Sequence, residues 1–355
     1  MKKAFTWTLQ FKHPEPQKPR KYVWPVFIPF AGCPYKCIYC SQFVQSGQAN
    51  QTPEQTVLNM NKGIMARYQR TGRPVSLGFF GGTFTALEMD EMIYYLEHAS
   101  FLKEKGAVDH LRCSTRPDCI GEKELIILKS FGLDMVELGI QSFDDRTLKC
   151  SGRGYSPGQA VLACSLVKKH GLELGIQLLP GLPGSGCTAF TADIEITRQI
   201  MPDIVRIYPC LVLKKTPLAK QMQKGHYRPW NLQITAFLLS RALLRLWQEK
   251  IIVIRLGLAP EPELIKNILA GPWHPALGAI CRSEALRYYI LLQLAKSSTR
   301  PSLLYIPEKY VSDFWGYKKM NVKSLSKKGI TRDNARIWNK KDFKIYFHDQ
   351  ASAVL

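Results

Sequence analysis

The chain has 355 residues, of which 46% are hydrophobic, so it can form one barrel-sized domain with a smaller appendage. Its 49 Lys and Arg against 28 Asp and Glu give a net charge of +21, which favours polyanions or acidic partners. The most apolar stretch, 236–258, is interrupted by charged residues, and the N-terminus has no apolar signal core. We therefore expect a cytoplasmic protein without a membrane span.

Three regions follow one another along the chain: a basic N-terminal segment (1–21), a core domain (22–210) and a C-terminal extension (211–355). In the core domain, six short apolar runs alternate with helical patterns. The runs are VFIPF, VSLGFF, LRCS, MVELGI, LELGIQLL and IVRIYP. The predicted helices begin at Thr52–Pro53 and cover about 88–104, 122–131, 156–171 and 189–200. Six strand–helix units indicate an α/β fold with a parallel sheet, either a partial (β/α)6 TIM-like barrel or an open wound sheet.

Glycines and polar residues follow successive predicted strands. A cysteine loop follows the first strand, Gly81–Gly82 the second and Ser114–Arg116 the third, while Gln141–Ser142 and a Pro/Gly turn at 180–184 follow the next two. Parallel folds place their ligand at the carboxyl ends of the strands. The sequence therefore predicts a cofactor site at this edge of the sheet.

The C-terminal extension predicts a smaller α+β region, with helices over about 231–248 and 283–295 and a strand-like run at 251–258. Its tail interleaves aromatic residues with Lys and Arg. The aromatic residues are Phe314, Trp315, Tyr317, Trp338, Phe343, Tyr346 and Phe347. This pattern is typical of RNA contact. A solvated basic surface over a small aromatic core, and docking of an acidic electron donor, are the alternatives.

Cys33, Cys37 and Cys40 form a C-x3-C-x2-C loop. Three thiolates at this spacing can hold three corners of a [4Fe–4S] cluster, which leaves one iron open for a substrate or cofactor. A zinc site would want four ligands, and a disulfide framework or a chance cluster of cysteines is a further alternative. The other seven cysteines are scattered singly, which indicates a reducing compartment.

The loop CPYKCIYC resembles that of the radical S-adenosylmethionine superfamily. The resemblance implies that Cys33, Cys37 and Cys40 ligate the cluster and that Tyr39 lies beside the adenine of S-adenosylmethionine. The segment FFGGTF, with Gly81, Gly82 and Thr83, is similar to the turn that holds the methionine amino group in that family. Thr83 stands where many members carry an acidic residue, and a simple tight turn is the alternative for this segment.

A closer resemblance covers about 25–209. The segments GGTFT, STRPD, ELGIQSFDD, SGRGYS and LLPGLPG resemble the radical domain of the Elongator catalytic subunit and its short bacterial relatives without the acetyltransferase domain. The resemblance implies cofactor contacts for five side chains: Ser114 and Arg116 near the ribose and carboxylate, Gln141 on the cofactor, Arg153 on its carboxylate and Gln177 near the ribose. The alternatives are a surface arginine at 153 and ordinary polar residues in the barrel at 141 and 177. Ser114 stands where relatives often carry an acidic residue.

The remaining motifs indicate less. The segment after residue 210 has no Gly-rich acetyl-coenzyme A loop, so an acetyl-transfer step is not supported. GLPGSG at 181–186 lacks the Lys-Ser/Thr ending of a phosphate loop. His274 is either a hydrogen-bonded turn residue or an acid–base group, and Cys281 either a buried thiol or a hydrogen-atom donor.

These features predict a radical S-adenosylmethionine enzyme. It would use a [4Fe–4S] cluster to cleave S-adenosylmethionine to a 5′-deoxyadenosyl radical and would act on tRNA or another RNA, with flavodoxin or ferredoxin as reducing partner. The alternatives are an enzyme of the same class acting on a small metabolite, and a non-catalytic iron–sulfur RNA-binding protein. The sequence names no catalytic residue.

Overall fold

The computed structural model describes residues 6–17, 22–28, 31–41 and 51–348. Pro29 and Phe30 at the end of the first apolar run lie outside the described residues, as do five basic residues of the N-terminal segment: Lys2, Lys3, Lys18, Arg20 and Lys21. The chain forms two compact units from interleaved segments. The larger unit contains 17–232 and 251–273, and the smaller unit contains the described residues of 1–16, 233–250 and 274–355. The division of the sequence into the regions 1–21, 22–210 and 211–355 stays a proposal.

The larger unit is built on a seven-stranded sheet in the order β2-β3-β4-β5-β6-β7-β9, in which every neighbouring pair is parallel. The strands are β2 (Val23–Ile28), β3 (Val75–Gly81), β4 (Val108–Thr115), β5 (Met135–Gln141), β6 (Glu173–Leu178), β7 (Ile204–Ile207) and β9 (Ile252–Leu256). The predicted α/β partial barrel is therefore confirmed. Its seventh strand comes from the run at 251–258, which the sequence pattern assigned to the C-terminal region.

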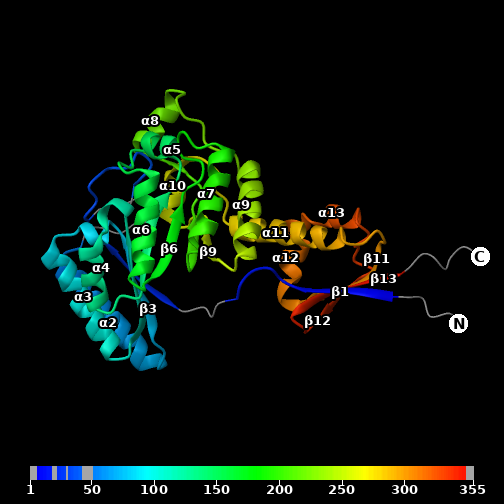
Figure 1. Cartoon of the computed structure of the whole chain (residues 1–355), viewed down its shortest axis with the longest axis horizontal. Helices are drawn as coiled ribbons and strands as arrows, with labels where there is room; N and C mark the ends of the chain where they lie inside the picture. The colour runs from blue at the N-terminus through cyan, green and yellow to red at the C-terminus, as the bar shows by residue number, and fades with distance from the viewer. Residues whose placement is uncertain (1–5, 18–21, 29–30, 42–50, 349–355) are drawn as a thin grey trace, which may run out of the picture. The chain divides into compact units, whose positions relative to one another are not determined.

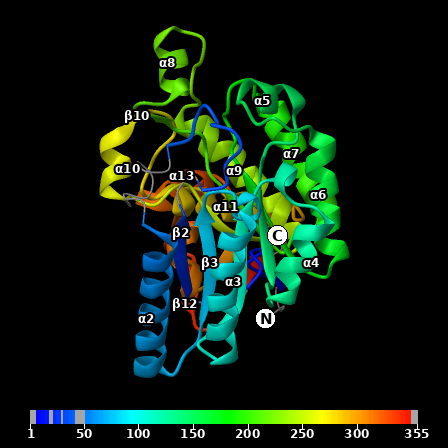
Figure 2. The same ribbon diagram turned by 90° about the vertical axis from the view of Figure 1, so that its left-hand side faces the viewer.

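The two faces of this sheet differ in chemistry. One face carries fully buried apolar side chains, among them Leu77, Phe79, Leu111, Val136 and Ile176. Figures 1 and 2 show α2, α3, α4 and α6 running beside the strands. The alternate residues make the other face polar: Ser76, His110, Arg112, Ser114, Glu137, Glu173, Gln177 and Arg206. Period-two alternation thus separates a core face from a face available for chemistry.

The helices that join the strands follow their sequence signals. They are α2 (Pro53–Thr71), α3 (Met89–Glu104), α4 (Glu122–Ser130), α5 (Asp145–Cys150), α6 (Pro157–Lys169) and α7 (Cys187–Ile200). Thr52 caps α2 by accepting a hydrogen bond from the backbone N–H of Gln55, and Ser156 with Gln159 forms a capping box on α6. The short helix α5 was not predicted from the sequence, because its six residues are too few to show an amphipathic period.

After β7, four short elements pair and pack within the larger unit. They are β8 (Val212–Leu213), α8 (Pro217–Gln223), α10 (Pro262–Asn267) and β10 (Ile268–Ala270), and β8 pairs antiparallel with β10. Leu218 on α8 belongs to a buried cluster with Leu182 and Val212, and Ile38 and Tyr39 of the cysteine loop pack against it. This part of the C-terminal extension therefore supports the cysteine loop.

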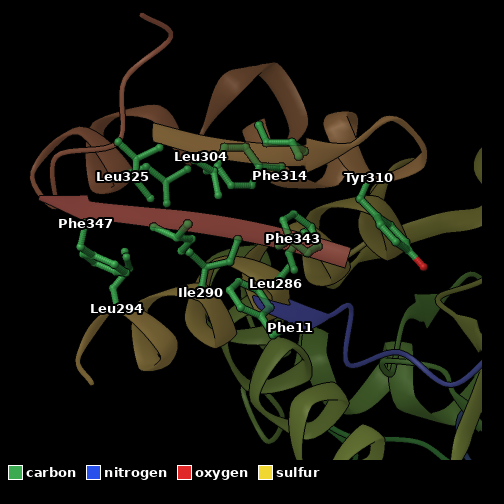
Figure 3. Packing of buried hydrophobic residues seen from close by; sticks show 13 residues of the cluster. Phe11, Leu286, Ile290, Leu294, Leu304, Tyr310, Phe314, Leu325, Phe343 and Phe347 are labelled. Carbon is green, nitrogen blue, oxygen red and sulfur yellow. The ribbon is translucent and has the colours of Figure 1, made fainter. Parts of the chain in front are cut away.

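The smaller unit is a four-stranded sheet in the order β1-β13-β11-β12 with helices around one apolar core. Its elements are β1 (Thr6–Lys12), α9 (Leu232–Gln248), α11 (Leu277–Leu294), β11 (Pro301–Pro307), α12 (Val311–Trp315), α13 (Val322–Ser326), β12 (Ala335–Trp338) and β13 (Asp342–His348). Figure 3 shows the core, in which Phe343 and Phe347 of β13 gather with Leu286, Ile290 and Leu294 of α11. The antiparallel pairing of β1 with β13 joins the two ends of the chain and had no signal in the sequence. Among the described residues, no helix is both long enough and apolar enough to cross a bilayer.

Candidate cofactor site at the cysteine loop

The cysteine loop leaves β2 and lies at the carboxyl edge of the sheet. Cys37 is buried, while Cys33 and Cys40 are partly exposed. Backbone hydrogen bonds hold the loop on both sides: Ile38 N–H donates to the carbonyl of Ser151 at 3.4 Å, and Leu218 N–H donates to the carbonyl of Ile38 at 2.9 Å. All ten cysteines lie in the described part of the chain, and none of them forms a disulfide there.

The glycine turn after β3 packs directly on the start of this loop. Thr83 N–H donates to the carbonyl of Ala31 at 2.8 Å, and a Cβ added to Gly82 would fall onto that same carbonyl oxygen. Gly32, at φ +68°, is crowded in turn by the backbone of Thr83 and Ala86. The glycines thus permit one backbone to approach another, and they bring the Oγ1 of Thr83 to 3.3 Å from the Sγ of Cys33.

Arg153 lies behind Cys37 and is only 4% exposed. One guanidinium nitrogen, Nη1, donates to the Sγ of Cys37 at 3.2 Å and to the hydroxyl of Tyr39 at 3.4 Å. Nη2 donates to the carbonyl of Gly139 at 2.5 Å, and Nε donates to the hydroxyl of Tyr155 at 3.0 Å. The surface-arginine alternative is therefore wrong, and the predicted contact with the cofactor carboxylate stays a proposal.

Arg116 is a second buried guanidinium beside the same sulfur, with its Nη1 3.7 Å from the Sγ of Cys37. Asp118 holds it in a two-pronged ion pair, through Nε at 2.9 Å and Nη2 at 2.8 Å. Nη2 also donates to the carbonyl of Arg153, and the guanidinium lies over the rings of Tyr35 and Tyr155. A planar cation held in this way is fixed in orientation as well as in position.

Tyr39 is held by the protein from two directions. Its ring packs against the buried cluster around Leu182 and Val212, and its hydroxyl accepts from Arg153. Burial raises the pKa of Tyr39 well above its usual range, so the hydroxyl stays protonated and the contact with the guanidinium is that of a neutral acceptor. The predicted position beside an adenine stays a proposal.

Gln141 and Gln177 lie together at the ends of β5 and β6. The amide of Gln177 donates to the Oε1 of Gln141 at 3.4 Å. Gln141 is buried and has φ +66°, a left-handed conformation that is uncommon for a residue other than glycine. The turn that follows is held by the buried carboxylate of Asp193, which accepts from the Oγ of Ser142 at 2.8 Å and from the N–H of Phe143 at 2.6 Å. Strained conformations of this kind concentrate at functional sites.

Ser114, at the end of β4, lies across a small hollow from the glycine turn. The hollow is partly open to solvent and is lined by Ser114, Thr83, Gly82, Ile28 and the aromatic rings of Phe79, Phe80 and Phe84. The structure therefore groups the predicted residues in three places. Tyr39, Arg116 and Arg153 surround Cys37. The turn of Gly81, Gly82 and Thr83 meets Cys33 through Thr83, and Ser114 lies across the hollow from this turn. Gln141 and Gln177 form a pair on β5 and β6.

Several residues that shape the site were missed at the sequence level. Tyr155 and Asp118 orient the two arginines, and both stand within two residues of the arginine that they hold, in STRPD and SGRGY. Lower on the polar face, Glu137 bridges Arg206 at 2.6 Å and Arg112 at 3.3 Å. The three residues of this second group lie on three different strands. Only their position as polar residues between apolar ones in each strand could have indicated them.

The two residues of uncertain role in the smaller unit have structural explanations. His274 Nδ1 accepts from the N–H of Ala276 at 3.0 Å, and its ring meets that of Tyr317 edge-on, as expected for a hydrogen-bonded turn residue. Cys281 is fully buried, and burial raises the pKa of its thiol to about 12. A buried, protonated thiol agrees with the simpler of the two interpretations.

The donor set fits an iron–sulfur cluster. Three cysteines on one loop offer soft sulfur ligands, and two buried guanidinium groups donate toward one of the sulfurs. Those cations would balance the negative charge that thiolate ligands bring. Within the described ranges, no three His, Cys, Asp or Glu side chains converge on a point that could hold a single metal ion.

Comparison with known proteins connects these features to a family. The family model described as the radical SAM superfamily matches residues 27–186, and the model of a radical SAM C-terminal domain matches 202–287. A protein named tRNA uridine(34) acetyltransferase from Methanocaldococcus infernus is 29% identical over 240 residues, which cover 57% of this chain and 45% of that protein. A coproporphyrinogen-III oxidase-like protein, HemZ of Bacillus subtilis, is 27% identical over 56% of this chain and 40% of its own length.

Among solved structures, the archaeal Methanocaldococcus infernus Elp3 lacking residues 1–46 superposes with a TM-score of 0.57 at 23% identity, and the match covers 77% of this chain and 63% of that one. This likeness shows the same fold. The chain spans about half the length of the curated relatives that it matches.

Proposed function

We propose that this chain, which belongs to the radical S-adenosylmethionine superfamily, binds a [4Fe–4S] cluster through Cys33, Cys37 and Cys40 and uses it to cleave S-adenosylmethionine. Members of the family generally use these two cofactors. When bound, they supply the one-electron reductive cleavage of a C–S bond that releases a 5′-deoxyadenosyl radical. The observation that carries the proposal is the cysteine loop with one sulfur held against two buried guanidinium groups.

The chain's own residues would bind and orient the cofactors. Arg153 and Arg116 would balance the charge at Cys37 and are locked by Tyr155 and Asp118. The hydroxyl of Thr83 lies 3.3 Å from the Cys33 sulfur and would accept a hydrogen bond from the methionine amino group, a role in which a neutral oxygen is weaker than a carboxylate. Ser114 and Gln177 would supply neutral hydrogen bonds near the ribose, and Gln141 would contact the cofactor.

For the substrate, we propose tRNA or another RNA. Two kinds of support exist: relatives named as tRNA uridine(34) acetyltransferases match over more than half of this chain, and the net charge of +21 attracts a polyanion. Flavodoxin or ferredoxin remains the proposed electron donor, and a cytoplasmic location remains a prediction. An acetyl-transfer step is not part of the proposal.

A second candidate is radical chemistry on a small anionic metabolite. Arg112 and Arg206 lie on the polar face of the sheet, where both contact the carboxylate of Glu137. The Nε of Arg112 is buried without a hydrogen-bond partner. The similarity to a coproporphyrinogen-III oxidase-like protein agrees with this alternative.

The test is cleavage of S-adenosylmethionine by the anaerobically reconstituted chain. With dithionite as reductant, chromatography should detect 5′-deoxyadenosine from the wild type and from Cys150→Ala, which changes an exposed cysteine outside the loop. Cys37→Ala should form none. An intact cluster without cleavage would favour the non-catalytic iron–sulfur alternative. Stimulation of cleavage by tRNA, rather than by a small-molecule extract, would separate the two substrate classes.

A further inference from the structure

The sheet of the smaller unit has one face that its helices do not use. The core cluster takes Phe343, Ile345 and Phe347 from β13 and Leu304 and Ile306 from β11. The alternate residues of the same strands point the other way, and they include Tyr305 on β11 and both Lys344 and Tyr346 on β13. Thr8, Gln10 and Lys12 on β1 and Arg336 on β12 continue this face by their register and are exposed.

Three aromatic rings form a row across this face. Tyr346, Tyr305 and Trp338 stand on the neighbouring strands β13, β11 and β12. The ring centroids of Tyr305 and Trp338 are 4.8 Å apart, and those of Tyr305 and Tyr346 are 6.0 Å apart. All three rings are partly exposed, and the indole of Trp338 is fixed because its Nε1–H donates to the carbonyl of Asp342 at 2.8 Å.

Cations accompany the rings. The Nζ of Lys344 lies 4.8 Å from the centroid of Tyr346, and the Nζ of Lys340 lies 5.3 Å from that of Trp338. Lys12 and Arg336 add two more charges on the same face, and Asp342 is the acidic residue among these positions. The face therefore combines flat apolar surfaces with a positive field.

We infer that this aromatic face, made of Tyr305, Trp338, Tyr346, Lys340 and Lys344, binds single-stranded RNA, with bases stacked on the three rings and phosphates beside the lysines. A four-stranded sheet with aromatic residues on its open face is a recurrent way to stack two or three unpaired bases. Stacking needs an exposed base face, so duplex RNA would be excluded. The choice of RNA over another polyanion rests on the proposed function. The geometry of the aromatic face is independent of the proposed function.

The experiment is fluorescence anisotropy of a labelled single-stranded RNA of about ten nucleotides, titrated with the full-length chain. Trp338→Leu and Tyr346→Leu should each weaken binding by about five-fold or more, because base–aromatic stacking contributes on the order of 1–3 kcal/mol per base. Thermal melting establishes that each variant is folded. Since Trp338 also bonds the backbone, Lys340→Gln with Lys344→Gln provides a second variant that removes no buried group.

The matched control is Lys327→Gln with Lys328→Gln, which removes the same charge from exposed positions directly after α13. The double variant on the aromatic face should lower the slope of log affinity against log salt by about 1.4, and the control should leave it unchanged. Equal effects in the two double variants, unchanged affinity in both ring variants, or equal affinity for duplex RNA would each overturn the inference. The inference would also be overturned if an acidic polypeptide displaced the RNA equally well from the wild type and from the ring variants. That result would identify the face as a protein-docking surface.

The binding assay needs neither S-adenosylmethionine nor a reductant, so its failure is distinct from failure of the proposed function. A chain that binds single-stranded RNA through the rings but forms no 5′-deoxyadenosine would refute the radical chemistry and leave this inference standing. A chain that cleaves S-adenosylmethionine but does not bind single-stranded RNA would refute this inference and leave the radical chemistry standing.

Discussion

The Nη1 of Arg153 donates to the Sγ of Cys37 at 3.2 Å, across 116 positions of sequence. A positive charge at this distance from a cluster ligand stabilises the reduced, more negative state of the cluster. Arg153→Met should therefore lower the reduction potential of the cluster by about 60 mV if the guanidinium contributes about 1.4 kcal/mol to the difference between the two states. Arg153→Lys should recover part of this shift.

The potential is measured by redox titration of the reconstituted variants, followed by electron paramagnetic resonance. Thermal melting of each apo-protein provides the control for folding. An unchanged potential in a folded Arg153→Met variant would show that the arginine has only a structural role.

Asp118 holds Arg116 in place and compensates its buried charge. Asp118→Asn leaves two guanidinium groups beside Cys37 with no carboxylate bound to either, so it should lower the free energy of unfolding by about 3 kcal/mol. Removing the arginine as well, in Arg116→Gln with Asp118→Asn, should recover part of the loss. Urea denaturation measures both, and additive losses in the double variant would contradict a coupled pair.

Gly82 is expected to be intolerant of any side chain, because a Cβ there would fall onto the carbonyl oxygen of Ala31. Gly82→Ala should push the glycine turn away from the cysteine loop and lower the iron content of the reconstituted protein several-fold. Gly158→Ala is the matched control: it lies in the first turn of α6, and the nearest atom to its Cβ would be the Oγ of Ser156 at 3.8 Å. Gly158→Ala should keep full iron content and raise stability by about 0.5 kcal/mol. Equal iron content in the two variants would contradict this account of the turn.

Asp193 makes stability depend on pH. Burial raises the pKa of this carboxyl from 3.8 to about 6, so the folded protein holds the proton more tightly than the unfolded chain does. Well below pH 4 the carboxyl is protonated in both states. As the pH rises from about 4 to about 6, the unfolded chain loses its proton first, and the free energy of unfolding falls by up to about 3 kcal/mol. Above pH 6 this contribution is constant.

The measurement is urea denaturation of the wild type and of Asp193→Asn across this pH range. Asparagine cannot titrate, so the difference in free energy of unfolding between the two proteins should shift in favour of the variant as the pH rises. A difference that stays constant from pH 4 to pH 7 would mean that the carboxyl has an ordinary pKa.

Sequence signals predicted the first six strands of the larger sheet and most of the helices that join them, because the determinants of these elements are local. Thr52–Pro53 and Ser156–Pro157 mark helix starts through their own caps, and the run MVELGI is a strand by composition alone. The pairing of Trp7 with Phe347 had no such signal, because it depends on contacts between opposite ends of the chain. At the site, spacing within eight residues predicted the cysteine loop, whereas two partners of Arg153, Gly139 and Cys37, come from distant parts of the sequence. The resemblance to relatives predicted a contact of Arg153 with the cofactor carboxylate, which stays a proposal, and did not predict its contact with Cys37.

We propose that Cys33, Cys37 and Cys40 hold a cluster whose fourth iron is open to S-adenosylmethionine. Electron paramagnetic resonance of the reduced, reconstituted chain tests this proposal, with spectra recorded before and after addition of S-adenosylmethionine. We expect about four irons per chain, a spectrum that changes on addition, and loss of the signal in Cys37→Ala. A cluster spectrum indifferent to S-adenosylmethionine, or one that survives in Cys37→Ala, would contradict it.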